Sequence, residues 1–225
     1  MFKNAKNAAF IIAVISAVAV TAVICIFVIA NGGGKLTYKA DYYYICYRIA
    51  DNSVSASSLS ETASSYGGAG YVITHDGNYY ATVSCYYSEN DADGVCSSLK
   101  RRGLDCSVLK ISTDKFKLKT RSARKNAELY AGNLNTLNSL SLLAYECANA
   151  LDLGNYNQSK AKDVASALKS GLNGLLRANE NNCFTDRLEN LVDICDDKCD
   201  GYIYSKDMRY IQIAVTDVII NAEIY

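Results

Sequence analysis

Two periodicities alternate between residues 41 and 111, and this alternation constrains the fold more than any other feature of the sequence. Short runs with tyrosine or aliphatic residues at every second position predict β-strands. The segments between them are Ala/Ser-rich or repeat apolar residues every three to four positions, which predicts helices. The resulting order is strand, helix, strand, strand, helix, strand. This order predicts an α+β domain with a ferredoxin-like βαββαβ arrangement and a four-stranded antiparallel sheet.

Turn and cap signals set the limits of these elements. Asp76-Gly77-Asn78 is a tight hairpin signal between two strands. Ser88 is an expected helix N-cap, and Gly103 is expected just past the end of the same helix. The predicted strands cover residues 43–49, 71–74, 79–87 and 104–111, and the predicted helices cover 57–65 and 88–103.

The same stretch resembles the SPOR (sporulation-related) domain family. The resemblance lies in Gly68-Ala69-Gly70-Tyr71-Val72-Ile73 before the hairpin, in Tyr79-Tyr80-Ala81-Thr82-Val83, and in residues 88–108. It implies an extracytoplasmic, noncatalytic domain that binds glycan strands of peptidoglycan, often at division or spore septa. The chain departs from the family in lacking a Gln in the first and third strands, with Thr82 where the family often has one.

A membrane anchor is predicted before this domain. Residues 8–30 carry no charge, and 23 helical residues would extend roughly 35 Å, enough to cross a bilayer. Lys3 and Lys6 precede this segment, which favours a cytoplasmic N-terminus and places the chain after Asn31 outside the cell. Val28-Ile29-Ala30 leaves a poor signal-peptide cleavage site as the alternative. We therefore expect a single-pass protein of the cell membrane.

The C-terminal half predicts an all-helical bundle, because its apolar residues recur at a helical spacing. The expected helices cover residues 121–151, a segment from Ser159, residues 185–195, and a segment from Ser205. Residues 112–120, rich in lysine, are the expected hinge. The predicted domains are a short cytoplasmic N-terminal segment with the membrane anchor (1–30), the SPOR-like domain (31–112), a basic linker (113–120) and the bundle (121–225). No family is recognised in the bundle.

Strand alternation predicts an open sheet face rich in tyrosine. Aromatic rings flanked by hydroxyl groups suit sugars, whose CH groups stack on the rings. With the family resemblance, this face is the expected glycan-binding site. Its candidate residues are Tyr42, Tyr44, Arg48, Tyr80, Thr82 and Tyr86. The alternative is that these tyrosines are simply β-formers or pack on the helical half.

No recognisable catalytic or cofactor motif accompanies this surface. His75 is the single histidine and lies beside a turn, so a hydrolytic triad or zinc site is not expected. Residues 196–207 resemble an EF-hand calcium loop, with Asp196, Asp200 and Asp207 as candidate ligands, but Lys198 replaces one oxygen ligand. An Asp-rich turn between helices is the favoured interpretation. We expect a binding protein without enzyme activity, cofactor or metal.

The chain has nine cysteines, one of which, Cys25, falls in the predicted anchor. The remaining eight permit a disulfide framework. Cys85, Cys96 and Cys106 are expected on core-facing positions, where free thiols behave as small hydrophobic groups. Mostly free, buried thiols are the favoured interpretation.

The sequence thus predicts a membrane-anchored peptidoglycan-binding protein that acts at a division or sporulation septum. The bundle would offer a platform for an envelope protein partner, and no nucleic acid partner is expected. The alternative is an assembly protein, because residues 57–111 also resemble the ring-building modules of spore-envelope channel proteins.

Overall fold

A computed structural model describes residues 35–117, 127–179 and 185–222. The predicted anchor, residues 8–30, lies outside these ranges. Within them, no helix combines the length and the apolar character that crossing a membrane requires.

The described chain has an α+β fold built around one four-stranded antiparallel sheet in the order β2-β3-β1-β4. The strands are β1 (Lys35–Ala50), β2 (Tyr71–His75), β3 (Asn78–Tyr86) and β4 (Ser107–Lys117). Helix α2 (Ser53–Ser65) joins β1 to β2, and helix α3 (Glu89–Arg101) joins β3 to β4. The predicted βαββαβ order is confirmed.

Local signals account for the ends of these elements. The side chain of Ser88 accepts a hydrogen bond from the Asp91 backbone N–H and caps α3, as expected. Asp76 and Gly77 both adopt positive φ, at 48° and 78°, which is the geometry of a two-residue type I′ hairpin. Glycine and aspartate tolerate this conformation, so the β2–β3 turn follows directly from its sequence.

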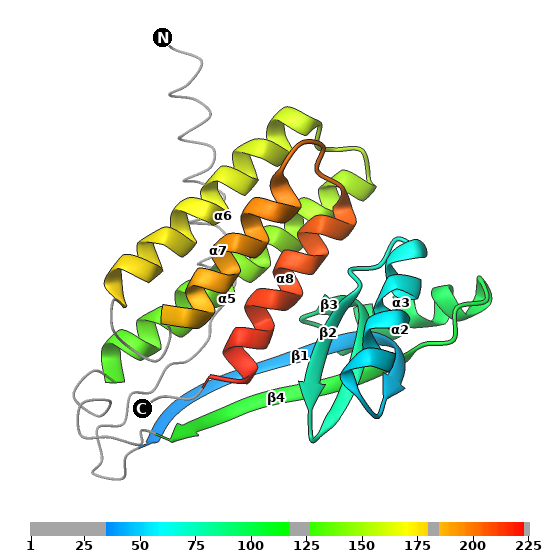
Figure 1. The fold of residues 1–225 in the computed structure, drawn as a ribbon, viewed down its shortest axis with the longest axis horizontal. Helices are drawn as coiled ribbons and strands as arrows, with labels where there is room; N and C mark the ends of the chain where they lie inside the picture. Colours follow the sequence, from blue (N-terminus) through cyan, green and yellow to red (C-terminus); the bar gives the residue numbers. More distant parts are fainter. Residues whose placement is uncertain (1–34, 118–126, 180–184, 223–225) are drawn as a thin grey trace.

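The described residues of the C-terminal half form four helices, and each of these helices packs against two of the others (Figure 1). They are α5 (Ala127–Asp152), α6 (Gln158–Ala178), α7 (Thr185–Cys199) and α8 (Ser205–Ile220). The predicted bundle is therefore present. Residues 121–126, predicted as the first turns of α5, lie outside the described residues.

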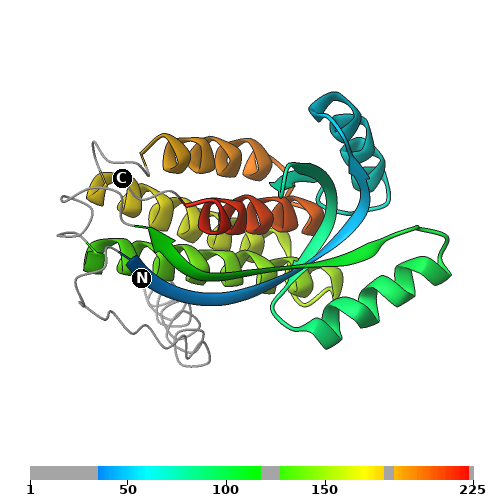
Figure 2. The same cartoon turned by 90° about the horizontal axis from the view of Figure 1, so that it is seen from below.

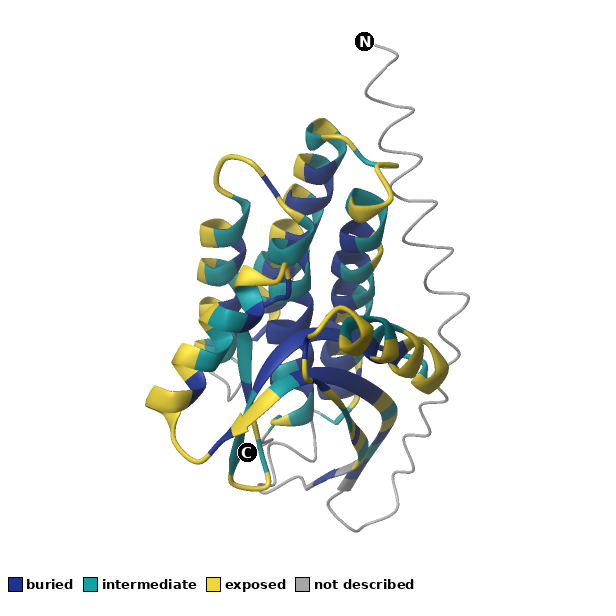
Figure 3. Cartoon of the chain, turned by 90° about the vertical axis from the view of Figure 1, so that its right-hand side faces the viewer, coloured by how far each residue is buried: buried dark blue, intermediate teal, exposed yellow. Residues whose placement is uncertain are grey.

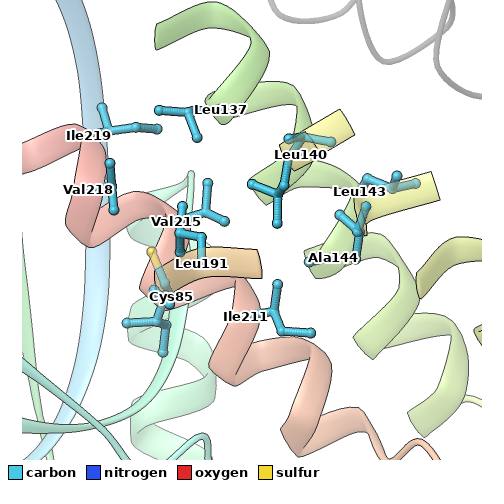
Figure 4. Close-up of a cluster of buried hydrophobic side chains, with 14 of the residues drawn as sticks. Cys85, Leu137, Leu140, Leu143, Ala144, Leu191, Ile211, Val215, Val218 and Ile219 are labelled. Atoms are coloured by element: carbon cyan, nitrogen blue, oxygen red, sulfur yellow. The ribbon is translucent and has the colours of Figure 1, made fainter. Parts of the chain in front are cut away.

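The bundle lies directly on the sheet, so the molecule has three layers: α2 and α3, the sheet, and the bundle. Figure 2 shows β1 and β4 running along the bundle, with α2 and α3 beyond its end. Helices α5 and α8 contact the strands, and one hydrophobic core joins both halves. Cys85 of β3 lies in this core beside Leu191 and Val215 (Figure 4). The prediction that this sheet face is open is therefore wrong, because the bundle buries its apolar stripe against it.

The boundary predicted between the two halves is also wrong in part. Strand β4 continues to Lys117, so residues 113–117 belong to the sheet and not to a linker. They pair with the first residues of β1, where Leu36 lies opposite Phe116. Both side chains are buried in the core shared with the bundle. The lysines of this segment suggested a solvated linker, but the apolar residues between them determine its structure.

Irregular pairing between β1 and β3 reverses the predicted direction of two side chains. Ile45 pairs with Ser84, but the next residue, Cys46, pairs with Thr82, so Val83 is the extra residue of a β-bulge. Beyond the bulge the alternation is inverted. Cys85 consequently faces the bundle and Tyr86 faces α2 and α3, opposite to the prediction from strict alternation.

Candidate functional site

Three of the six predicted site residues are completely buried beneath the bundle. Tyr42, Tyr44 and Thr82 are each 0% exposed. The Tyr42 hydroxyl donates a hydrogen bond to Asn138 Oδ1 of α5 at 3.0 Å, and the Thr82 hydroxyl donates to the Tyr71 carbonyl at 2.6 Å. The first bond joins the sheet to the bundle and the second joins β3 to β2 within the sheet, and a ligand cannot reach these groups in this arrangement. Figure 3 shows the buried residues gathered where the strands meet the bundle.

The other three predicted residues lie apart. Tyr80 is half-buried against the bundle core, and Arg48 is exposed, with its guanidinium 5.5 Å from the centre of the Tyr47 ring. Tyr86 faces the opposite side of the sheet. The structure therefore does not bring the six residues together on one accessible surface.

Tyr86 instead lines a groove where the three layers meet, which we call the junction groove. Its volume is about 470 Å³. The loop after α2, strand β3, helix α3, the end of α5 and the start of α8 all contribute to it. The lining residues are Tyr66, Gly67, Gly68, Val83, Ser84, Tyr86, Val95, Leu99, Arg102, Asp152, Ser205 and Arg209.

The glycine loop after α2 forms one wall of the groove. The N–H of Gly68 bonds to the Ala63 carbonyl at 3.0 Å and closes the helix end. A Cβ on Gly68 would lie 2.9 Å from that carbonyl oxygen and 2.9 Å from Val83 Cγ1, so the close approach of loop and strand requires glycine. This approach leaves the preceding ring, Tyr66, 58% exposed at the rim.

The floor of the groove contains a polar atom without a partner. Ser84 is 4% exposed, and among the described residues its Oγ has no hydrogen-bond partner. An unsatisfied buried hydroxyl costs about 1–3 kcal/mol, so such groups usually have a purpose. Beside it, the Tyr86 ring packs edge-on against Tyr145 of α5, with ring centres 5.8 Å apart. The Ser84 hydroxyl is almost fully covered in this arrangement, so a ligand in the groove reaches it only when a neighbouring side chain moves aside.

Charged groups lie at the side of the groove nearest the bundle. Arg209 of α8 forms an ion pair with Asp152 of α5. Burial alone would raise the pKa of Asp152, but hydrogen bonds from Arg209 and Ser205 and the nearby guanidinium charge lower it overall. Asp152 is thus held ionised. Arg102, exposed at the end of α3, adds a second guanidinium to the lining.

Together these groups favour a ligand with hydroxyls and an acidic group. Tyrosine rings offer flat apolar faces, the hydroxyl of Ser84 offers a donor, and guanidinium groups bind carboxylates in a planar geometry. The arrangement is one that binds a polar molecule.

Residues 196–207, for which the sequence favours an Asp-rich turn over a calcium loop, do not have the geometry of an EF-hand. Asp196 lies inside α7 and forms an ion pair with Lys169 at 2.5 Å. Asp207 accepts a hydrogen bond from the Tyr204 backbone N–H and caps α8. Two of the three candidate carboxylates therefore have structural partners, and among the described residues no group of three or more His, Cys, Asp or Glu side chains is placed to hold a metal ion.

Comparisons with known proteins give one match. No family model matches the chain, and the comparison with curated proteins found no match. The solution structure of the peptidoglycan binding domain of the B. subtilis cell wall lytic enzyme CwlC matches at 24% identity and a TM-score of 0.28. The match covers 32% of this chain and 91% of that domain.

Proposed function

We propose that this chain is a noncatalytic cell-envelope protein that binds peptidoglycan glycan strands in the junction groove. The observation that carries the proposal is the chemistry of the groove lining, in which the exposed ring of Tyr66 accompanies the guanidinium groups of Arg102 and Arg209. The resemblance of residues 41–111 to SPOR domains supports a glycan as the ligand. The uncharged residues 8–30 support a membrane anchor, with the groove outside the cell at a division or sporulation septum.

The groove, unlike the predicted site on the sheet face, has accessible groups that can contact a sugar. The Tyr66 ring is exposed and can stack on the CH face of a sugar ring. Arg102 and the Arg209–Asp152 pair suit an acidic substituent or an acetamido group. These contacts are accessible while the bundle stays on the sheet.

The test is sedimentation of the full chain, in mild detergent, with purified cell-wall sacculi. A fragment ending at Ser112 would be unsuitable, because it removes part of β4 and uncovers Tyr42 and Tyr44. Tyr66→Ala should weaken binding by about 2–12-fold, the equivalent of one lost ring stack of about 0.5–1.5 kcal/mol. Sacculi with and without stem peptides distinguish a glycan from a peptide ligand.

Two matched variants make this test specific. Ser84→Ala should weaken binding and leave the stability unchanged or slightly higher, because its hydroxyl has no partner to lose. Tyr202→Ala removes a ring of similar exposure, 61%, that does not line the groove, and should bind as the wild type does. Wild-type protein that stays in the supernatant with both kinds of sacculi would refute glycan binding.

Assembly into an oligomer is the second candidate function. Strand β4 is one of the two edges of the described sheet, and it exposes Ser107, Lys110 and Ser112. Edge strands are templates for pairing with another chain. Sedimentation velocity of the full chain separates the two functions: ordered oligomers without wall binding favour assembly, and a monomer that pellets with sacculi favours the groove.

A further inference from the structure

Two buried cysteines from different elements lie in direct contact. Cys96 belongs to α3, and Cys106 directly precedes β4. Their Sγ atoms are 3.1 Å apart, and each Sγ lies 3.5 Å from the backbone carbonyl oxygen of the other residue. The sulfurs are thus about 1 Å beyond the separation of a disulfide bond, roughly 2.0 Å.

The surroundings hold this pair in place. Both residues lie in the smaller hydrophobic core between the sheet and its two short helices, together with Ile45 and Leu104. The end of α3 is closed by the N–H of Gly103 bonding to the Lys100 carbonyl at 3.0 Å, and the φ of Gly103 is +89°. The sulfurs have to approach by about 1 Å to reach bonding distance.

We propose that Cys96 and Cys106 form a disulfide that ties the end of α3 to the start of β4. The bond arises by exchange with a small-molecule or protein disulfide. One thiol loses its proton and attacks that disulfide, giving a mixed disulfide and releasing one thiol. The second cysteine then loses its proton and displaces the other thiol, so two electrons and two protons pass to the oxidant.

Burial determines when the exchange takes place. Burial, followed by the hydrogen bond with Cys96, raises the pKa of Cys106 to about 12. In the folded protein Cys106 therefore contains little thiolate, the form that attacks a disulfide. Exchange should be fast while α3 is undocked and slow once it has packed, and the finished bond should resist reductants in the folded protein.

The bond would also steady one wall of the junction groove. Val95 and Leu99 flank Cys96 on α3, and Arg102 follows at the helix end; all three line the groove. The disulfide does not depend on the identity of the ligand, however, and its test requires no ligand.

The direct test is to refold the reduced, denatured full chain in detergent with a glutathione redox buffer, then quench with acid, alkylate and digest with trypsin. Cleavage at Lys100, Arg101 and Arg102 separates the two cysteines. The expected product is peptide 49–100 linked to peptide 103–110, with Cys85 of the first peptide alkylated. Alkylation of both Cys96 and Cys106 even in fully oxidised glutathione, or linkage through Cys85, would overturn the proposal.

Thermal unfolding gives a second readout. The disulfide would close the loop between Cys96 and Cys106. A loop of this size should raise the Tm of the oxidised wild type by about 5–10 °C over that of the reduced form. Cys96→Ala and Cys106→Ala should lose this difference between oxidised and reduced protein, and Cys85→Ala should keep it. A wild-type Tm that does not respond to reductant would contradict the proposal even if the variants fold poorly.

Discussion

Both faces of the sheet are rich in tyrosine, but different helices cover them. On the face towards the bundle, Tyr42 and Tyr44 are 0% exposed in a continuous core. On the face towards α2 and α3, Tyr43 and Tyr86 belong to a smaller core that opens into the junction groove.

Helix length explains much of this difference. Helix α5 has 26 residues, about 39 Å, and covers its face of the sheet together with α8. Helices α2 and α3 have 13 residues each, about 20 Å. The shorter helices leave the edge of their core open. Tyrosine-rich strands therefore do not by themselves mark a ligand site; the covering elements decide which rings remain accessible.

The largest expected effect concerns the face covered by the bundle. Tyr44→Ala should lower the free energy of unfolding by about 3–5 kcal/mol, because it leaves a cavity in a fully buried core. Tyr202→Ala, at a ring 61% exposed, should change it by less than about 0.5 kcal/mol. Urea denaturation of both variants measures the difference. A Tyr44→Ala loss as small as the control would mean that the bundle does not cover this face.

A glycine pair tests the packing of the loop that forms the groove wall. Gly68→Ala should destabilise the protein by about 1–3 kcal/mol, since its Cβ would lie 2.9 Å from the Ala63 carbonyl oxygen. Gly94→Ala, in α3 with nothing within 4 Å of the new Cβ, should stabilise it by about 0.5–1 kcal/mol. Opposite shifts in the denaturation midpoint are expected. Equal effects would contradict the close approach of loop and strand.

The hydroxyl groups of the two faces should differ by a smaller amount. Tyr42→Phe removes a buried hydrogen bond to Asn138 and should cost about 1–2 kcal/mol. Tyr43→Phe affects a ring whose nearest charged neighbour is the exposed Lys110, and should cost less than about 0.5 kcal/mol. Both variants lose one tyrosine hydroxyl. The difference between their Tm values in thermal unfolding therefore compares the two faces directly. A larger loss for Tyr43→Phe would reverse the comparison.

The smallest expected effects concern two carboxyl groups, Asp217 in the last turns of α8 and Asp152 of α5, which pairs with Arg209 near the start of α8. Burial raises the pKa of Asp217, partly opposed by hydrogen bonds from Tyr71 and Asn221 and by the charge of Arg187. The stability that Asp217 contributes is therefore greatest below its unfolded pKa of about 3.8 and is lost as the pH rises through the folded value. Asp217→Asn should gain stability relative to the wild type between pH 4 and pH 7.

Asp152 provides the opposite case. Its pKa is lowered, so its contribution is present above the unfolded pKa and is lost as the pH falls through the folded value. Asp152→Asn should therefore lose stability relative to the wild type as the pH rises from the folded pKa of Asp152 to its unfolded pKa of about 3.8, and should change little above that range. Unfolding measured at several pH values for both variants should give slopes of opposite sign, each over its own pH range, and parallel slopes would contradict these assignments.

The order of elements could be predicted because each depends on nearby residues. The cap at Ser88, the positive φ at Asp76 and Gly77, and the helical spacing after Ala127 are all encoded locally. The contact between the halves could not be predicted in the same way. Alternation identifies an apolar face of the sheet, and helical periodicity identifies an apolar face of the helices. Neither pattern predicts that these two faces pack against each other.

The candidate site was harder to predict for two reasons. The bulge at Val83 reverses Cys85 and Tyr86, and strict alternation contains no signal for it. The groove also combines residues distant in sequence, such as Tyr66, Arg102 and Arg209. Gly68 was a partial signal, because a glycine permits the close approach of this loop to Val83 of the strand that forms the floor.

Two exposed arginines provide the most direct test of where the ligand binds. Arg48 belongs to the predicted sheet-face site, and Arg102 lines the junction groove; both are exposed. Sedimentation of the full-chain variants Arg48→Ala and Arg102→Ala with sacculi compares the two locations. Both side chains are exposed, so the two substitutions should change the stability of the fold by similarly small amounts. Arg101→Ala, next to Arg102, serves as the control. We predict about tenfold weaker binding for Arg102→Ala and wild-type binding for the other two. Weaker binding for Arg48→Ala with no change for Arg102→Ala would contradict the account.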